Sequence, residues 1–343
     1  MNNTPNKLYA ILLLAIGLFN ECSVAADNQQ CTQQQNKEAS ELASPEPAST
    51  DTIQKKPFRN FTINPDGKKI LTRFVNNDTN WVRPYDTDYA RWLLDRKLFP
   101  IDHKVKYYNG EEKQNNGGRN KIISVGVLKY DLVGTFSKNK ERPADLQQCA
   151  DACIRLWAEY LWEHKMYDKI HFKNAPGFVF YYKKWAEGYR VHFDKNWKAS
   201  WSKDAGVDYS YTTFRKYLSL VFTYCGTATL AKEMMTVKST DIQPGDILIW
   251  GGSPGHAVTV MDVLRNKQTG KLKVMFSQSY MPAQEIEILA NNEDNYRWTD
   301  KWTKGMWFSP WFEIDEEKSP VINTPQWTFD LSDGAKFVRW RDR

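Results

Sequence analysis

The stretch that decides the fold runs from Asp241 to Gln284 and reads DIQPGDILIWGGSPGHAVTVMDVLRNKQTGKLKVMFSQSYMPAQ. Its apolar runs are separated by a glycine and proline turn and by a polar loop. They predict three successive strands, from 246 to 250, from 256 onward and from 272 to 279. His256 opens the second strand directly after the turn, so a stiff element holds its ring while the ring stays reachable. This position is suited to a general base.

The hairpin formed by the last two of these strands brings a polar side chain toward His256. If its loop is centred between Gln268 and Thr269, His256 and Gln278 are near diagonal neighbours. A bulge in the loop 266–271 would bring the two directly opposite each other. A glutamine there can hold an imidazole in one tautomer without adding charge. The alternative is a solvent-exposed strand end.

The segment 144–164, ADLQQCADACIRLWAEYLWEH, is the clearest helix in the sequence. Its apolar residues recur at the three-and-four spacing of one helical face: Leu146, Cys149, Cys153, Leu156 and Tyr160. Pro143 suits a helix start, and Asp145 favours the positive end of the helix dipole. Shorter helical patterns occur within 83–98 and 209–235, the latter broken at Gly226, and 121–132 alternates like a strand.

Cys149 lies in the first turns of this predicted helix, where backbone N–H groups and a partial positive charge lower the pKa of a thiol. A nucleophilic cysteine needs a histidine to take its proton and a third polar group to orient that histidine. The chain supplies these groups in the order Cys149, His256, Gln278. The alternative is core packing, because free cysteine is among the most buried residue types and Cys149 lies on the apolar helix face.

The segments IQPGDILIWGGSPGHAVTVMDV and MFSQS resemble the second half of the NlpC/P60 and CHAP superfamily of papain-like cysteine hydrolases, and QQCADACIRLWAEYLW resembles their nucleophile helix. The resemblance implies an α+β, papain-like fold in which an antiparallel sheet packs on a nucleophile-bearing helix, with a helical insertion at 167–235. It also implies that Cys149 is the nucleophile, His256 the base and Gln278 the orienting residue.

Three further residues complete the expected site. Backbone N–H groups at the helix start, with the side chain of Gln148, are expected to bind the oxyanion, and Gly255 and Ser279 are expected at the substrate. A longer stretch, roughly 71–312, resembles a bacterial domain of unknown function, the family numbered 4846, through DLQQCADACIRLWAEYLW, FRKYLSLVFTYCGTATL and SQSYMPAQEIEIL. That second resemblance implies a fold and no particular activity.

These patterns predict an exported cysteine hydrolase that cleaves an amide bond, with peptidoglycan peptides as substrate. Two alternatives remain open: a non-catalytic envelope-binding module of the same fold, and a thiol-dependent acyl or amide transferase. We expect no metal and no cofactor, because no CxxC pair occurs and the histidine and cysteine spacing fits no zinc template. A disulfide between Cys153 and Cys225 is left open by the sequence.

Charge and composition bound the partners. After Phe58 the chain is rich in Trp, Tyr and Phe and shows no repeat, which predicts one domain over 58–343. Nucleic-acid-binding motifs are absent, so no nucleic acid partner is expected. The net charge of +6 favours peripheral contact with an anionic envelope, and the alternative is an ordinary solvated basic surface.

The beginning of the sequence predicts export. Leu8 to Phe19 is an unbroken apolar run, too short for a membrane span, and small residues follow it, as in a signal peptide covering 1–26. The segment 27–57 is rich in Gln, Glu, Ser, Pro and Ala and predicts a disordered tether. The mature chain would then lack a transmembrane segment and be periplasmic or secreted. The alternative is a lipoprotein anchored at Cys22.

We therefore expect that the protein expressed in a bacterium begins near Ala26 or Asp27 and carries no lipid. N-terminal sequencing together with intact mass measures this directly. A mature chain that begins at a lipidated Cys22 would instead establish the anchored form.

Overall fold

The computed structural model describes residues 61–115, 122–137, 140–292 and 308–343. They belong to the unit that runs from Pro57 to Arg343. The predicted signal peptide and tether lie outside the described residues, so both stay predictions. None of the helices in the described ranges has the length and apolar character needed to span a bilayer.

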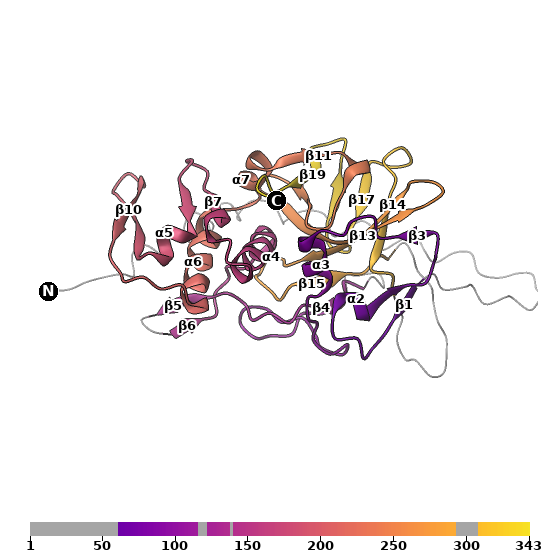
Figure 1. The fold of residues 1–343 in the computed structure, drawn as a ribbon, viewed down its shortest axis with the longest axis horizontal. Coiled ribbons are helices and arrows are strands. Elements are labelled where there is room, and N and C mark those ends of the chain that lie inside the picture. Colours follow the sequence, from indigo (N-terminus) through magenta and orange to yellow (C-terminus); the bar gives the residue numbers. More distant parts are fainter. Residues whose placement is uncertain (1–60, 116–121, 138–139, 293–307) are drawn as a thin grey trace, which may run out of the picture. The chain divides into compact units, whose positions relative to one another are not determined.

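A large antiparallel sheet of nine strands organises the described residues (Figure 1). Seven of its strands follow one another in the spatial order β11 (Met235–Val237), β19 (Ala335–Arg339), β12 (Ile247–Trp250), β13 (His256–Asn266), β14 (Leu272–Gln278), β15 (Glu287–Leu289) and β4 (Ser124–Val127). Two more strands pair with central strands, β16 (Trp311–Ile314) with β14 and β3 (Trp81–Val82) with β13.

The three strands expected in the stretch 241–284 are confirmed as the centre of this sheet. β13 begins at His256 as predicted, β12 begins one residue later than expected, and β14 ends one residue earlier. All three are almost entirely buried, because helices cover one face of the sheet and the β17–β18 ribbon lies on the other. Their apolar runs are therefore nearly continuous rather than alternating.

Short helices and two-stranded ribbons surround the sheet. The helices are α2 (Ile70–Arg73), α3 (Asp88–Leu94), α4 (Cys149–Glu163), α5 (Tyr182–Ala186), α6 (Tyr211–Tyr224) and α7 (Thr227–Glu233), with 3-10 turns η1 (Tyr167–Lys169) and η2 (Ser239–Asp241). The ribbons pair β1 (Phe61–Ile63) with β2 (Phe74–Asn76), β5 (Thr135–Ser137) with β6 (Lys140–Arg142), β7 (His171–Lys173) with β8 (Val179–Tyr181), β9 (Tyr189–Phe193) with β10 (Ala199–Lys203), and β17 (Val321–Asn323) with β18 (Thr328–Asp330). The fold is thus mixed α and β with antiparallel sheets.

The predicted helix 144–164 begins five residues later than expected, at Cys149. Gln148 has an extended backbone and is the N-cap, and its N–H donates to the Asp151 carboxylate at 3.0 Å. Asp145 precedes the first turn, whose acidic residue is Asp151, and its carboxylate accepts a 2.6 Å hydrogen bond from the backbone N–H of Ala283. The Asp145 contact joins the loop before α4 to the segment between β14 and β15.

Helix α4 is buried on every side, whereas the sequence pattern predicted one apolar face. It packs against β13 and β14 on one side and against α7 and η1 on another, and Figure 1 shows it between the large sheet and the 167–235 segment. Charged side chains of the helix bond to other protein groups: Arg155 donates to Glu159 at 3.2 Å, and the hydroxyl of Tyr211 in α6 donates to Glu159 at 2.7 Å. The polar face thus meets a second layer of protein instead of water.

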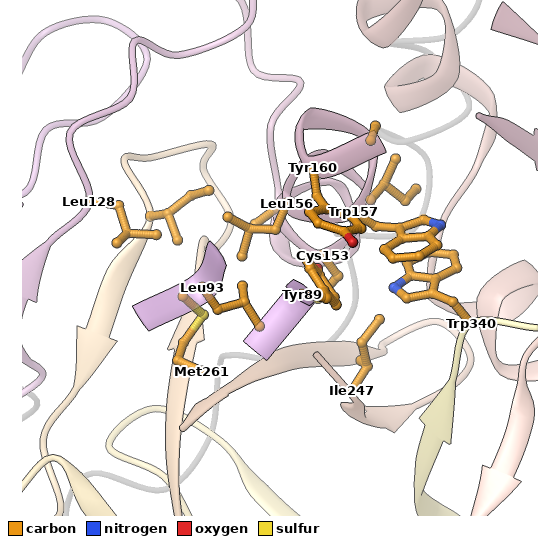
Figure 2. Close-up of a cluster of buried hydrophobic side chains, with 14 of the residues drawn as sticks. Tyr89, Leu93, Leu128, Cys153, Leu156, Trp157, Tyr160, Ile247, Met261 and Trp340 are labelled. Atoms are coloured by element: carbon orange, nitrogen blue, oxygen red, sulfur yellow. The ribbon is translucent and has the colours of Figure 1, made fainter. Parts of the chain in front are cut away.

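Aromatic side chains fill the contact between α4 and the sheet (Figure 2). The ring centroids of Tyr89 and Trp157 lie 5.0 Å apart, and Trp340 near the C-terminus stacks on Trp157 at 6.0 Å. Edge-to-face and offset aromatic pairs of this kind add to the free energy gained by burying the rings.

The 167–235 segment was expected to be a helical insertion, but it is mixed. It contains α5, α6 and α7, with Gly226 as the N-cap of α7 at the predicted break, and also the β7–β8 and β9–β10 ribbons. The ribbons carry aromatic residues at strand positions, such as Phe180 and Trp201, which the helical interpretation overlooked.

The turn before β12 depends on Gly245, and its replacement is expected to destabilise the domain. Gly245 has φ +90°, and a Cβ there would lie 2.3 Å from the Tyr89 ring. Gly245→Ala should lower the free energy of unfolding by about 2–5 kcal/mol, since it combines left-handed strain with overpacking. Urea denaturation measures this loss.

Gly110→Ala is the matched control, because Gly110 has φ +87° and a Cβ there would have no neighbouring atom within 4 Å. It should cost only the left-handed strain, about 1–2 kcal/mol. Equal losses in the two variants would show that the Tyr89 contact contributes nothing.

Candidate active site

Cys149 is the first residue of α4 and is partly buried. Its thiol donates to the backbone carbonyl of Gly255 with a sulfur to oxygen distance of 4.0 Å. The backbone N–H groups of Ala150 and Ala257 also bond to the sulfur. The start of α4 therefore places the thiol against the first residues of β13.

Burial raises the pKa of the Cys149 thiol to about 11, and the charge of Asp151 adds to the rise. The N–H groups of Ala150 and Ala257 lower the pKa, but their effect is smaller. The expectation of a lowered thiol pKa at the helix start is therefore wrong for this structure. Desolvation outweighs the helix terminus, so the thiol is protonated at neutral pH.

His256 and Gln278 are brought together, as the sequence predicted. The Nε2 atom of His256 lies 2.9 Å from Oε1 of Gln278, and only 2% of His256 is exposed. Burial lowers the pKa of His256 to about 4, and the charge of Lys113 lowers it further, while the Gln278 hydrogen bond works in the opposite direction. The imidazole is therefore neutral at pH 7, and a hydrogen bond joins its Nε2 to the carbonyl oxygen of Gln278.

A β-bulge makes this contact, but at a different place from the one expected. The register shifts between Val260 and Asp262 inside β13, not in the loop 266–271. One extra residue in a strand moves all later side chains to the other face. With Thr259 paired to Ser277, the same register places Gln278 diagonally from His256 on one face, rather than directly opposite it.

The thiol and the imidazole both lie at the start of β13, where the thiol contacts the Gly255 carbonyl. Ala257 belongs to the core beneath α4, so strand alternation directs His256 to the other face, where its ring contacts Trp327 and Phe329 at 5.3 Å and 5.7 Å. The ring of Tyr280 lies 4.9 Å from that of His256. Burial raises the pKa of Tyr280, and the charge of the Cys149 sulfur adds to the rise, so Tyr280 is a neighbour of both groups.

Two other predicted site residues, Ser279 and Gln148, make hydrogen bonds within the protein. Ser279 is fully buried, and its hydroxyl lies 2.6 Å from the Gln147 carbonyl and 2.8 Å from that of Gln284, so it joins the end of β14 to the start of α4 instead of facing a substrate. Gln148 is half-buried, and its side chain donates to Asp145 at 3.0 Å.

Gly255 allows the close approach of its own turn and the start of α7. A Cβ on Gly255 would lie 2.4 Å from the hydroxyl of Thr227 and 2.6 Å from the carbonyl oxygen of Gly252. Any side chain there would move the turn whose carbonyl faces the sulfur. Gly255 is therefore needed for its small size.

The other two described cysteines are free thiols in the core, and no disulfide joins Cys153 to Cys225. The thiol of Cys153 donates to the Cys149 carbonyl, and that of Cys225 to the Lys173 carbonyl, each at 3.5 Å. Burial raises the pKa of both. They are packing residues.

The family model described as a domain of unknown function (4846) matches residues 70–335. The chain belongs to this family. No curated protein and no solved structure matches it. The NlpC/P60 and CHAP resemblance therefore stays an expectation for this member of family 4846, and its activity has to be argued from the site.

Sequence reasoning missed the polar residues behind His256 in this family 4846 domain. They are all buried or partly buried and are joined by hydrogen bonds: Lys113, Gln284, Glu287 and Gln326. The alternation in EIEIL, with a carboxylate between isoleucines of a short buried strand, was the one signal for Glu287. Lys113 lies in a polar loop, where nothing in the sequence distinguishes it from a surface lysine.

Because the pKa of His256 is lowered, the free energy of unfolding should depend on pH. The unfolded chain binds a proton at the ordinary histidine pKa of 6.5, whereas the folded domain resists it until about pH 4. The stabilisation from a neutral His256 is therefore fully present above pH 6.5 and is lost as the pH falls from 6.5 to 4, amounting to about 3 kcal/mol.

Urea unfolding of wild type and His256→Gln between pH 7.5 and 4 tests this, and the difference between the two curves isolates His256 from the carboxylates. The wild type should lose more free energy of unfolding over this range. Parallel curves would mean that His256 titrates normally in the folded domain.

Proposed function

We propose that this family 4846 domain is a cysteine hydrolase that cleaves an amide bond, with a papain-like arrangement of Cys149, His256 and Gln278. The observation that supports it most directly is the 2.9 Å contact between His256 Nε2 and Gln278. Because the Gln278 carbonyl can only accept a hydrogen bond, Nε2 carries the ring proton and Nδ1 is free to accept one. Cys149 contacts the start of the same strand, β13, through the Gly255 carbonyl. A thiol, a free imidazole nitrogen and an orienting amide are the groups that nucleophilic thiol catalysis requires.

The reaction starts from a neutral pair, because burial disfavours both the thiolate and the imidazolium. His256 Nδ1 accepts the thiol proton as the sulfur attacks the carbonyl carbon of the amide. The carbonyl oxygen becomes an oxyanion, and backbone N–H groups at the start of α4 stabilise its charge. The imidazolium then donates its proton to the leaving amine, and a thioester forms.

Water completes the turnover. His256 takes a proton from the water as its oxygen attacks the thioester carbon. The carbon–sulfur bond breaks, the carboxylic acid leaves, and the proton returns to the Cys149 sulfur. Gln278 keeps the ring oriented in both halves, because its carbonyl accepts the Nε2 proton throughout and stabilises the imidazolium.

Peptides of peptidoglycan are the proposed substrate class. The predicted signal peptide supports a location in the envelope, and the resemblance to NlpC/P60 and CHAP hydrolases supports an amide of the cell wall. The non-catalytic envelope-binding module and the thiol-dependent transferase are the competing functions. A hydrolase releases a free acid, a transferase joins the acyl group to another acceptor, and a binding module forms no product. One assay of the products therefore separates all three.

We expect Cys149→Ala and His256→Ala each to reduce muropeptide cleavage by on the order of 10³-fold or more, because each removes a group that the chemistry needs. Liquid chromatography with mass spectrometry of the digest measures cleavage, and circular dichroism checks the fold. Cys153→Ala is the matched control, since Cys153 is on the same helix and is buried in the core.

Cleavage that survives Cys149→Ala would rule out the thiol mechanism. Muropeptide binding by the wild type without cleavage would support the binding module. A product joined to an added amine, formed in place of the free acid, would support the transferase.

A further inference from the structure

Behind the His256–Gln278 pair lies a buried ion pair that the proposed reaction does not use. Lys113 Nζ lies 2.7 Å from Oε1 of Glu287, and their side chains are 4% and 0% exposed. The same ammonium lies 2.8 Å from Oε1 of Gln326, in the loop between β17 and β18. Taking two charges out of water is unfavourable, so an apolar pair would fill this part of the core at least as well.

The ammonium fixes the direction of the hydrogen bonds around it. Lysine has only donors, so Glu287 and Gln326 must both present oxygens to Lys113. These two oxygens also lie 2.9 Å and 2.8 Å from Nε2 of Gln278. Acceptors on that side require the NH₂ group of Gln278 there.

The amide of Gln278 is thereby oriented. With its NH₂ group committed to Glu287 and Gln326, its carbonyl oxygen faces His256 Nε2 at 2.9 Å. A carbonyl can only accept, so the imidazole must carry its proton on Nε2. Donation thus runs from the ring through the Gln278 amide to the oxygens of Glu287 and Gln326, which Lys113 holds as acceptors by donating to them as well.

We propose that Lys113 and Glu287 are positioning residues that hold His256 in the Nε2–H tautomer and so keep Nδ1 free as the base. The catalytic consequence rests on the proposed function, whereas the tautomer itself does not. A wrong tautomer would place a proton on Nδ1, and His256 could then no longer accept the thiol proton.

Removal of the cation should reverse the chain. In Lys113→Met the carboxylate of Glu287 is buried without its counter-charge, and such a group takes up a proton. The protonated carboxyl can then donate to the carbonyl of Gln278. The amide turns, its NH₂ group faces His256 Nε2, and the ring proton moves to Nδ1.

Nitrogen-15 NMR of the histidine rings in the full chain at pH 7 tests this. The chain has five histidines, and comparison with His256→Ala assigns the signals of His256. In the wild type Nε2 should be the protonated nitrogen. In Lys113→Met the pattern should shift to a protonated Nδ1, and muropeptide cleavage should fall about 10²- to 10⁴-fold.

Lys104→Met is the matched control, because Lys104 pairs with Glu112 at 3.2 Å on the surface of the same loop, with 65% of its side chain exposed. It should leave both the tautomer and the cleavage unchanged. The double variant Lys113→Met/Glu287→Met removes both charges, so it serves if the single variant does not fold, and it should give a mixture of tautomers.

A wild type with a protonated Nδ1, or an Nε2–H ring that persists in both Lys113 variants, would overturn the inference. A tautomer that shifts as expected in a protein without cleavage activity would uphold the inference and reject the proposed function.

Discussion

The constraint on which the site depends is the need to satisfy the buried carboxylate of Glu287. Its Oε1 accepts hydrogen bonds from Lys113, Gln278 and Gln284 at 2.7–2.9 Å. A charge taken out of water has to be paired and hydrogen-bonded. The three donors come from a loop, from the end of β14 and from the chain just before β15, so the carboxylate holds these segments in one arrangement around His256.

From this centre the framework continues to the thiol. The Gln284 carbonyl accepts from Ser279, whose hydroxyl also lies 2.6 Å from the carbonyl of Gln147, two residues before Cys149. The first residue of α4 is therefore set relative to β14 by hydrogen bonds, and relative to β13 by the Gly255 carbonyl. The same enclosure that positions the groups also desolvates them, which is why the pKa values of Cys149 and His256 move apart and the resting pair is neutral.

Local pattern was sufficient for much of the fold. The apolar runs of 241–284 predicted three adjacent strands with His256 at a strand start, and the three-and-four spacing of 144–164 predicted α4. The same pattern did not predict which segments pack around these strands and this helix. The three-and-four spacing predicted one apolar face of α4, whereas the charged side is also buried, with the Tyr211 hydroxyl of α6 donating to Glu159. Long-range packing of this kind leaves no periodic signal in the helix itself.

For the site, the sequence by itself determined where the candidate residues lie: a cysteine at a helix start, a histidine at a strand start and a glutamine on the next strand. Residue type and strand or helix position are local properties, so a single chain displays them. Only the tertiary structure decided the ionisation of these groups and the orientation of Gln278. Burial raises the pKa of Cys149, whereas the sequence predicted a lowered value. A one-residue bulge in β13 places Gln278 on the same sheet face as His256. Lys113, from a loop distant in the sequence, binds the carboxylate of Glu287. Each of these depends on tertiary contacts between segments that are distant in the sequence. Such contacts set how far a group is desolvated and which partners its hydrogen bonds have.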